Sequence, residues 1–234
     1  MKNKNFDINK YLIKSSLGFL SIIVFILGNL FLSLPLAFLD IESRLLMSII
    51  LIISTAILLF VLALIFKDVL YRDLIDFLKN KDLYFKKYFK FWFVILAGMF
   101  LSNIIAMQFT EGVAQNQEAV LNFLREMPLY MYFSAVIFAP IAEELVFRQG
   151  FRQIILNDKL FILLSGLSFG VIHIIAAEEI ISQLPFLPAY TIPGFVFAYL
   201  LVKTKNIFVP IGIHFVHNGV LISIQIIAMI FGGI

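Results

Sequence analysis

Long apolar stretches alternate with short charged ones along the whole chain. Seven of the apolar stretches are long enough to cross a bilayer, which takes about 20 residues of helix. The pattern predicts an all-α fold, a polytopic membrane helix bundle with about seven transmembrane helices. The predicted spans are residues 15–39, 45–66, 91–110, 127–148, 160–177, 180–202 and 206–234.

The stretch between the second and third spans, residues 67–90, has a different pattern. Leu70, Leu74, Phe77 and Leu78 recur at helical spacing, and aromatic residues then alternate with lysines. Such a stretch is typical of an amphipathic interfacial helix on an anionic membrane surface, although a solvated helix in a loop fits equally well. Nucleic-acid binding is not expected, because both ends of the stretch are tied to the bilayer.

The composition supports a membrane protein. Of the 234 residues, 62% are hydrophobic and 14% are charged, whereas a soluble domain carries about 25% charged residues. The length suits a single integral-membrane domain over residues 1–234, with a motif-bearing core at 127–234. The chain has no cysteine, which excludes disulfides and thiol chemistry.

The charges between the spans predict an orientation. Basic residues dominate before the first span, where Lys2, Lys4, Lys10 and Lys14 lie, and again in alternate loops, whereas acidic residues dominate the other loops. Because basic loops stay in the cytosol, we expect a multi-pass protein of the plasma membrane with a cytosolic N-terminus and an external C-terminus.

Two adjacent carboxylates lie at the end of the fourth apolar stretch. Ionisable residues at membrane depth are costly, so Glu143 and Glu144 mark a functional site. Glu144 and Arg148 have the spacing and order of a favourable ion pair on a helix, whereas Glu143 has no local partner. We expect Glu144 and Arg148 to give structural support and Glu143 to be chemical. Pro140 removes a backbone donor and loosens the turn before the pair. The alternative is two acids that cap a helix end at the headgroups.

The three histidines all lie in apolar stretches of the last third of the chain. His173 follows Gly166 and Gly170, whose small size lets helices approach closely and could bring His173 next to the glutamate helix. Taken alone, His173 is better explained as a buried histidine bonded to a carbonyl.

The last span carries His214, His217 and Asn218. His214 and Asn218 are four residues apart and share a face, and His217 lies nearby. One polar residue there would be explained by helix packing, but three together favour a site.

These segments together offer a carboxylate, two or three imidazoles and an amide. A Glu–His pair can take a proton from water, and His and Asn donors can stabilise an oxyanion. Equally, Glu143, His173 and His214 could hold a Zn²⁺ ion with an open position. Both interpretations point to hydrolysis of an acyl bond inside the membrane. Because Asn218 suits an oxyanion donor better than a zinc ligand, we favour a metal-free site, and no cofactor is firmly predicted.

The ordered motifs resemble those of the CPBP family, the CAAX proteases and bacteriocin-processing enzymes also called the Abi family. The resemblance covers roughly residues 127–234, and its small bacterial members fit this short chain best. The matching motifs are Glu143-Glu144-x-x-x-Arg148, Phe169-x-x-x-His173 and His214-x-x-x-Asn218.

The resemblance implies an intramembrane endopeptidase that cuts a membrane-bound peptide or protein substrate. It assigns water activation to Glu143 and His173 and the oxyanion site to His214 and Asn218. Members of the family are described both as metalloproteases and as metal-free glutamate proteases. The short chain makes prenylated CAAX substrates a weaker expectation.

Three rival interpretations remain. The segment Gly166-Leu167-Ser168-Phe169-Gly170 matches the G-x-S-x-G pattern of serine hydrolases, but that motif needs a strand–turn–helix elbow and this serine lies within a predicted helix. A transporter or immunity protein could use the same acids and imidazoles as a proton relay. An inactive family member could serve as a binding scaffold.

The predicted boundaries do not bring the motifs to one depth. At 1.5 Å per residue, Glu143 and His214 lie roughly 8–10 Å from the cytosolic ends of their helices, and His173 lies about 20 Å from its own. The three side chains meet only if the fifth helix starts outside the bilayer, tilts or is offset.

Overall fold

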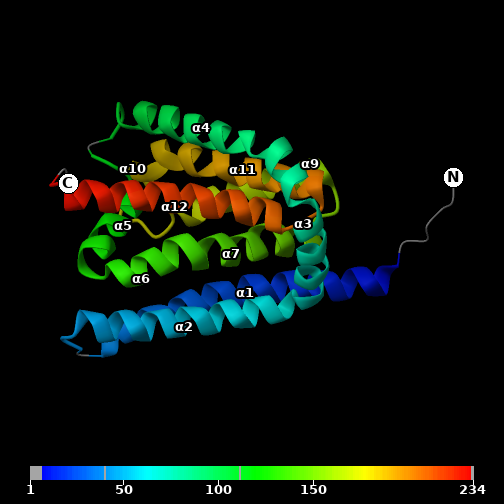
Figure 1. Ribbon diagram of the computed structural model, residues 1–234, viewed down its shortest axis with the longest axis horizontal. Coiled ribbons are helices and arrows are strands. Elements are labelled where there is room, and N and C mark those ends of the chain that lie inside the picture. Colours follow the sequence, from blue (N-terminus) through cyan, green and yellow to red (C-terminus); the bar gives the residue numbers. More distant parts are fainter. Residues whose placement is uncertain (1–6, 40, 111, 233–234) are drawn as a thin grey trace.

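The computed structural model describes residues 7–39, 41–110 and 112–232, and these residues form a bundle of helices (Figure 1). The π-helical segments are named η1 and η2, and the 3₁₀ segment is η3. In chain order the elements are α1 Ile8–Phe38, α2 Arg44–Ile65, α3 Lys67–Tyr88, α4 Lys90–Ala106, α5 Gln115–Glu126, α6 Pro128–Tyr132, η1 Phe133–Phe138, α7 Ala139–Glu143, η2 Glu144–Gly150, α8 Phe151–Ile154, α9 Asp158–Ile172, α10 Ile180–Gln183, η3 Leu184–Phe186, α11 Leu187–Thr204 and α12 Phe208–Ile230.

Several helix ends follow from local sequence. Asp7, Ser43 and Asn157 precede α1, α2 and α9, and each side chain accepts a hydrogen bond from the backbone N–H three residues later. This is the usual way in which a helix start satisfies an orphan donor. At the end of α11, Lys205 adopts a left-handed conformation with φ of 54°, and this tight turn leads directly to α12.

The all-helical membrane fold is confirmed, but the count of seven spans is not. In the described part of the chain, five helical segments are long and apolar enough to cross a membrane by themselves. They are α1, α2, the continuous helix α6–α8, the segment α10–α11, and α12. The third predicted span forms α4, which qualifies only together with α3, across a bend of 48°. The fifth forms α9, which has 15 residues and ends at Ile172.

Residues 67–88 do form a helix, α3, and it lies across one end of the bundle (Figure 1). Its buried Asp73 accepts a hydrogen bond from the backbone N–H of Ile207 at 2.9 Å. The Asn206 amide donates to the Asp73 carbonyl and to the Asp76 carboxylate. These bonds fasten α3 to the turn between α11 and α12. Whether the helix lies at the membrane interface stays a prediction.

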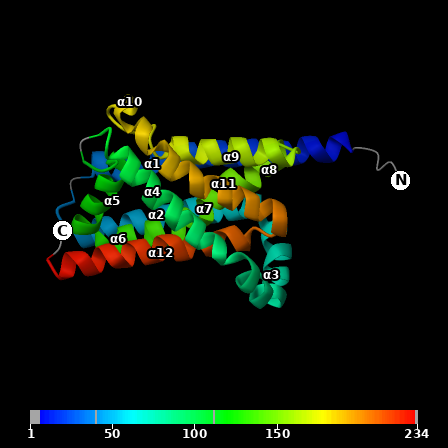
Figure 2. The same ribbon diagram turned by 90° about the horizontal axis from the view of Figure 1, so that it is seen from above.

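The α1–α2 pair forms one side of the bundle, and α1 packs closely on the motif-bearing helix α6–α8 (Figures 1 and 2). A Cβ atom on Gly18 would lie only 2.6 Å from the carbonyl oxygen of Gly150, so this crossing needs a glycine. Ser15 on the same face of α1 donates to the Gln153 carbonyl at 3.1 Å. The small residues of α1 thus set the distance to the glutamate helix.

Gly166 and Gly170 allow a close helix approach, as expected, but to a different helix. A Cβ on Gly166 would collide with the Phe195 ring, and one on Gly170 would collide with Thr191. Both partners lie on α11. The glycine face of α9 is therefore covered by α11 rather than by the glutamate helix.

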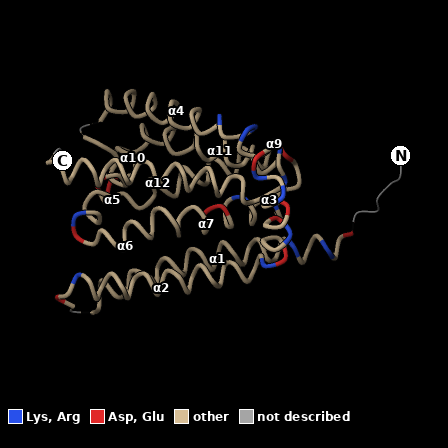
Figure 3. The backbone as a smooth tube through the Cα atoms, viewed as in Figure 1, with Lys and Arg blue, Asp and Glu red and all other residues tan. Residues whose placement is uncertain are grey.

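The charged residues gather at the ends of the bundle, except for those of the motif helix (Figure 3). Lys and Arg are concentrated at the end where α3 lies and where α1, α9 and α12 begin. Lys2 and Lys4, together with the loop acids Asp40 and Glu111, lie outside the described residues. The orientation in the membrane stays a prediction.

Candidate functional site

The motif helix is irregular around the two glutamates. Two π-helical segments, η1 and η2, flank the short helix α7 that contains Pro140. The sequence predicts a loosened turn at this proline, and π-helical turns are frequent at functional sites. Glu143 ends α7 and Glu144 begins η2. Glu143 is partly accessible, with 16% of its side chain exposed, whereas Glu144 is fully buried.

Glu144 and Arg148 form the expected ion pair. Glu144 Oε2 lies 3.0 Å from Arg148 Nε, and both side chains are completely buried. The guanidinium also lies over the rings of Phe169, at 4.3 Å, and Phe197, at 5.2 Å. Cation–π attraction of this kind is strongest for a desolvated cation. Arg148 is thereby held between an acid on its own helix and two aromatic rings from α9 and α11.

Glu144 has a second contact that the sequence did not indicate. Its Oε1 lies 3.0 Å from Nδ1 of His214 on α12, and His214 is buried at 4% exposure. The imidazole is also stacked on Phe197, with ring centroids 4.7 Å apart. A carboxylate can only accept, so Nδ1 carries the proton and donates it to Glu144. Glu144 therefore fixes both the orientation and the tautomer of His214.

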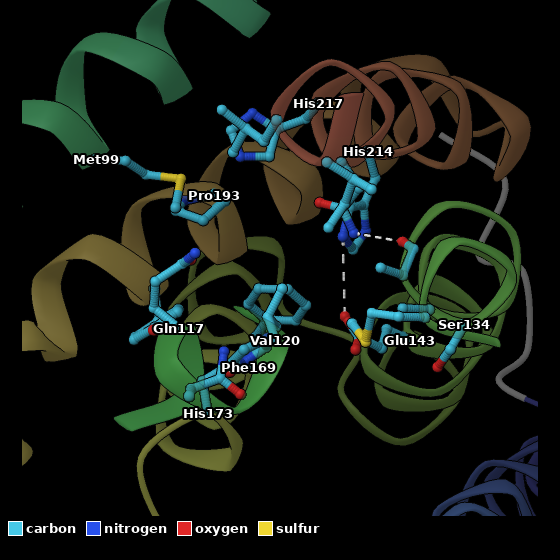
Figure 4. A pocket seen from close by; sticks show the side chains of 18 of the residues that line it. Met99, Gln117, Val120, Ser134, Glu143, Phe169, His173, Pro193, His214 and His217 are labelled. Atoms are coloured by element: carbon cyan, nitrogen blue, oxygen red, sulfur yellow. Dashed lines mark hydrogen bonds and ion pairs between the residues drawn. The ribbon is translucent and has the colours of Figure 1, made fainter. Parts of the chain in front are cut away.

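The other nitrogen of His214 faces Glu143. His214 Nε2 lies 3.9 Å from Glu143 Oε2, as the dashed line in Figure 4 shows. His214 thus stands between the two adjacent glutamates, one on each ring nitrogen. The sequence predicted that Glu143 and Glu144 lie on different faces of their helix. In the structure Glu144 contacts Nδ1 of His214, and Glu143 lies nearer to Nε2 of the same ring.

His173 lies at the end of α9, as its C-cap residue, rather than within a continuing span. Its Nδ1 lies 2.7 Å from the carbonyl oxygen of Phe169, one turn earlier, so Nδ1 donates and Nε2 is left as an acceptor. The ring is stacked on Tyr190 of α11, with centroids 4.9 Å apart and planes 17° apart. Tyr190, which the sequence analysis did not single out, therefore fixes the plane of His173.

Asn218 lies one turn beyond His214 on α12. Its amide donates to the carbonyl oxygen of Ala135 in η1 at 2.8 Å. That bond uses one amide hydrogen and leaves the other hydrogen and the side-chain oxygen free to act in the pocket. It also ties α12 to the π-helical segment ahead of the glutamates.

One pocket brings the motif residues together. It has a volume of about 240 Å³ and is lined by Glu143, His173, His214 and Asn218, together with His217 (Figure 4). The predicted boundaries placed these side chains at different depths in the membrane. They meet in the structure because the helices that carry them do not end at the same depth. The glutamate helix runs on to Ile154, so Glu143 lies ~16 Å from that end. His173 lies ~22 Å from the start of α9.

The serine hydrolase interpretation is not supported by the surroundings of Ser168. This residue lies inside α9, in regular helix, and lines a separate cavity with Phe25 and Phe147 on the α1 side. The G-x-S-x-G motif requires a strand–turn–helix elbow, and α9 provides none. Ser165, by contrast, donates to the Phe147 carbonyl at 2.6 Å and fastens α9 to η2.

The described residues contain no group of three His, Cys, Asp or Glu side chains arranged to hold a metal ion. The proposed zinc ligands Glu143, His173 and His214 line one pocket, and the bonds of the two Nδ1 atoms, to Glu144 and to a carbonyl, leave Nε2 of each ring as the nitrogen that could face an ion. Because the three side chains do not form a group that could hold a metal ion, we derive no step through a metal.

Comparison with known proteins shows which proteins this part of the chain resembles. Residues 125–220 match the family model described as type II CAAX prenyl endopeptidase Rce1-like. The chain is 31% identical to the putative membrane peptidase YdiL of Bacillus subtilis (strain 168), over 116 residues. It is 27% identical to the membrane-embedded CAAX protease MroQ of Staphylococcus aureus (strain USA300), over 145 residues. Residues 125–220 of the chain are therefore similar to the Rce1-like CAAX endopeptidase family.

The similarity to these membrane peptidases covers only part of each chain. The aligned part is 48% of this chain and 44% of YdiL, and 57% of this chain and 55% of MroQ. The chain thus spans about half the length of the curated relatives that it matches. No solved structure matches the chain. The partial similarity to membrane peptidases favours the peptidase prediction over the transporter and immunity-protein alternatives.

Proposed function

We propose that this chain is an intramembrane endopeptidase that hydrolyses a peptide bond of a membrane-associated peptide or protein. One observation carries the proposal. Glu143, His173, His214 and Asn218 come from three separate helical segments and line the same pocket inside an apolar bundle. The partial similarity to membrane peptidases supports the same activity.

Glu143 and His173 activate the attacking water in this proposal. Glu143 is the more accessible of the two acids and has no cation one turn away on its helix, so it is free to accept a proton. His173 directs a bare Nε2 away from its bond to Phe169. A water molecule between the carboxylate and this nitrogen has two acceptors for its hydrogens, which raises its nucleophilicity.

His214 and Asn218 stabilise the oxyanion. Because Nδ1 of His214 already donates to Glu144, Nε2 donates only when the ring is protonated. In that state the imidazole donates from both nitrogens, to Glu144 through Nδ1 and to the oxyanion through Nε2.

The reaction then balances without an added reagent. The water oxygen attacks the peptide carbonyl carbon, and its proton passes to Glu143. The carbonyl oxygen becomes an oxyanion held by Nε2–H of His214 and by the free amide hydrogen of Asn218. Glu143 returns the proton to the leaving nitrogen, the C–N bond breaks, and the products are a carboxylic acid and an amine.

The zinc-dependent version of the same hydrolysis is the alternative. Elemental analysis of purified, active protein separates the two versions. Stoichiometric zinc that is lost together with activity on chelation, and restored with activity on adding the ion back, would replace the metal-free proposal.

The experiment that tests the activity compares membrane peptides from three strains. One strain lacks the protein, one carries the wild type, and one carries Glu143→Gln. We expect one or more uncut precursors to accumulate in the first and third strains and to be cut in the second, as seen by mass spectrometry. Equal peptide profiles in the second and third strains would contradict the proposal.

We further propose an N-terminus in the cytosol and a C-terminus outside, with α3 on the cytosolic face of the plasma membrane. The concentration of Lys and Arg at the α3 end supports this orientation (Figure 3). The first described residues of α1 and the last of α12 lie at opposite ends of the bundle (Figure 1). A reporter that is active only in the cytosol, fused after Ile234, should be silent, whereas an active fusion would reverse the orientation or change the number of spans.

A further inference from the structure

His217 is a buried imidazole that the proposed chemistry does not use. It is 4% exposed, and its Nδ1 has no hydrogen-bond partner among the described residues. An unpaired polar atom in an apolar interior is costly. His217 lines the pocket that contains Glu143 and His214, so its nitrogen is available to a molecule that enters there.

A second cavity continues from this pocket. It has a volume of about 380 Å³ and lies between α4, α11 and α12. The two cavities share lining residues, among them Met99, Tyr190 and His217. Figure 4 shows Met99 and His217 toward one side of the catalytic pocket, with Glu143 and Ser134 toward the other. The second cavity therefore opens next to the reacting groups rather than at a separate surface.

The second cavity is lined mainly by apolar side chains. They include Leu96, Phe100, Phe186 and Leu221. An apolar cavity of about 150 Å³ is already large enough to bind benzene. The cavity beyond His217 therefore has room for an aromatic or branched aliphatic side chain.

Two polar side chains of α12, His217 and Gln225, line both cavities, with Leu221 between them. The three residues are spaced by four and form one stripe on the helix. Gln225 Oε1 is buried and, like His217 Nδ1, has no partner among the described residues. At 1.5 Å per residue the stripe is ~12 Å long, which roughly four residues of extended peptide would cover.

An extended peptide inside a membrane protein needs such groups. Its backbone N–H and C=O groups have no partners of their own, and each unsatisfied group in an apolar interior costs free energy. His217 Nδ1 and Gln225 Oε1 supply two hydrogen-bonding positions along one line, beside a cavity for a side chain.

We infer that the second cavity is a substrate subsite for one large apolar side chain, and that His217 and Gln225 bind the backbone of the extended peptide beside it. This inference rests on the proposed function and deepens it by naming the specificity of the site. His217 acts as a specificity and positioning residue, and the bond that is cut lies at Glu143 and His214.

The test uses a pool of synthetic peptides randomised at each position, supplied to the full-length protein in phospholipid vesicles. Cut peptides are sequenced by mass spectrometry. Among the peptides cut by the wild type, Phe, Trp, Leu or Met should be enriched at one fixed position relative to the cut bond. Among those cut by Leu221→Trp, in which the new side chain fills the cavity, Gly, Ala or Ser should be enriched at the same position.

Matched variants separate filling of the cavity from a general disturbance of α12. Ile224→Trp places the same residue on an exposed face of the same helix, where Ile224 is 57% exposed, and should keep the wild-type preference. Leu221→Ala enlarges the cavity and should broaden acceptance toward larger side chains, so the inference stays testable if Leu221→Trp folds poorly.

His217 is tested by kinetics on one peptide selected from the pool. His217→Leu should raise KM by roughly 3- to 10-fold, the effect of one lost hydrogen bond, with a smaller change in kcat. His217→Asn, which can still make the bond, should restore most of the KM. Equal KM values for the Leu and Asn variants would contradict backbone binding by His217.

Three further results of the peptide experiment would contradict the subsite or the proposed peptidase activity. Cleavage by the wild type with no enriched position, or with a preference unchanged in both Leu221 variants, overturns the subsite and leaves the proposed function standing. Cleavage only of farnesylated peptides, lost in Leu221→Trp, would assign the cavity to an isoprenyl chain and overturn the side-chain subsite. Identical products from the wild type and Glu143→Gln would refute the proposed function and the subsite with it.

Discussion

The α1–α2 pair and the glutamate helix α6–α8 differ in how much of their apolar surface is buried in the protein. In the most apolar part of each helix, 17% of the residues of α1 and 28% of those of α2 are buried, against 39% in α6–α8. The segment α10–α11, which packs around the site, is 50% buried, whereas α12 is 22% buried and is close to the pair in this respect. The buried polar residues of the pair are small, such as Ser21 and Thr55, whereas the motif helices bury Glu144 and Arg148. Buried charged residues therefore mark the candidate site more clearly than the extent of burial of a helix does, because α12 contributes to the site although it is little buried.

The physical reason is that lipid tails are as apolar as leucine, so helices in a bilayer gain little by burying aliphatic surface against each other. The pair is held by close contacts of small residues, such as Gly18 on Gly150. The motif helices are held by charges and hydrogen bonds that have no other partner in the membrane. The similarity to the family model, over residues 125–220, falls in this second region.

The largest expected effect is on Glu143, the accessible acid of the site. Glu143→Gln keeps the size of the side chain but cannot accept the proton from water. Loss of a general base lowers a rate by about 10²–10⁴-fold, and we expect thermal stability to be unchanged. The measurements are cleavage rate and melting temperature in one detergent. Full activity of the variant would remove Glu143 from the mechanism.

The next effect is on the buried pair of Glu144 and Arg148. Either Glu144→Gln or Arg148→Gln leaves one buried charge without its ion-pair partner, which lowers the free energy of unfolding by about 3–5 kcal/mol. The double variant should cost less than the sum of the two, because neither charge is left unpaired. The amide oxygen introduced by Glu144→Gln can still accept the hydrogen bond from His214, so activity should fall mainly with the folded fraction.

The same variants sharpen the contrast between the two acids. If Glu143→Gln destabilises the protein while Glu144→Gln is stable but inactive, then the roles of the acids are reversed. Unfolding by denaturant and the cleavage rate, measured on all four variants, distinguish these cases.

Two serines of α9 provide a smaller and matched comparison. Ser165→Ala removes the hydrogen bond to the buried Phe147 carbonyl and should cost about 1–3 kcal/mol. Ser168→Ala, one turn on, should leave both stability and the rate nearly unchanged. A loss of activity without a loss of stability in Ser168→Ala would revive the serine hydrolase interpretation.

The smallest effect is expected on the lipid-facing side of α1. The side chain of Leu30 is 62% exposed. In a bilayer it contacts lipid both in the folded protein and in the separate helix before assembly, so it adds little to stability. Leu30→Ala should therefore change the free energy of unfolding by less than about 0.5 kcal/mol. A cost of several kcal/mol would show that this face of α1 contacts protein in the membrane.

Local sequence relations were sufficient for several features. The positions of the long apolar helices followed from apolar runs, and the Glu144–Arg148 pair followed from a four-residue spacing, because both depend on neighbours within one or two turns. The short polar helix α5 was not predicted. The set of motif residues was also available from sequence, since ionisable groups stand out against apolar stretches. The family model spans residues 125–220, the part of the chain in which these positions lie.

Relations between helices were decided only by the tertiary structure. The contact of Glu144 with His214, the stacking of His173 on Tyr190 and the packing of the α9 glycines on α11 all depend on how far each helix is shifted along its neighbour. The end of α9 at Ile172, next to the candidate site, was likewise not indicated by the apolar pattern. The sequence by itself determined which residues are candidates for the chemistry, but an apolar pattern does not specify how far one helix is shifted along its neighbour. Side-chain packing across the bundle placed the two nitrogens of His214 between two acids.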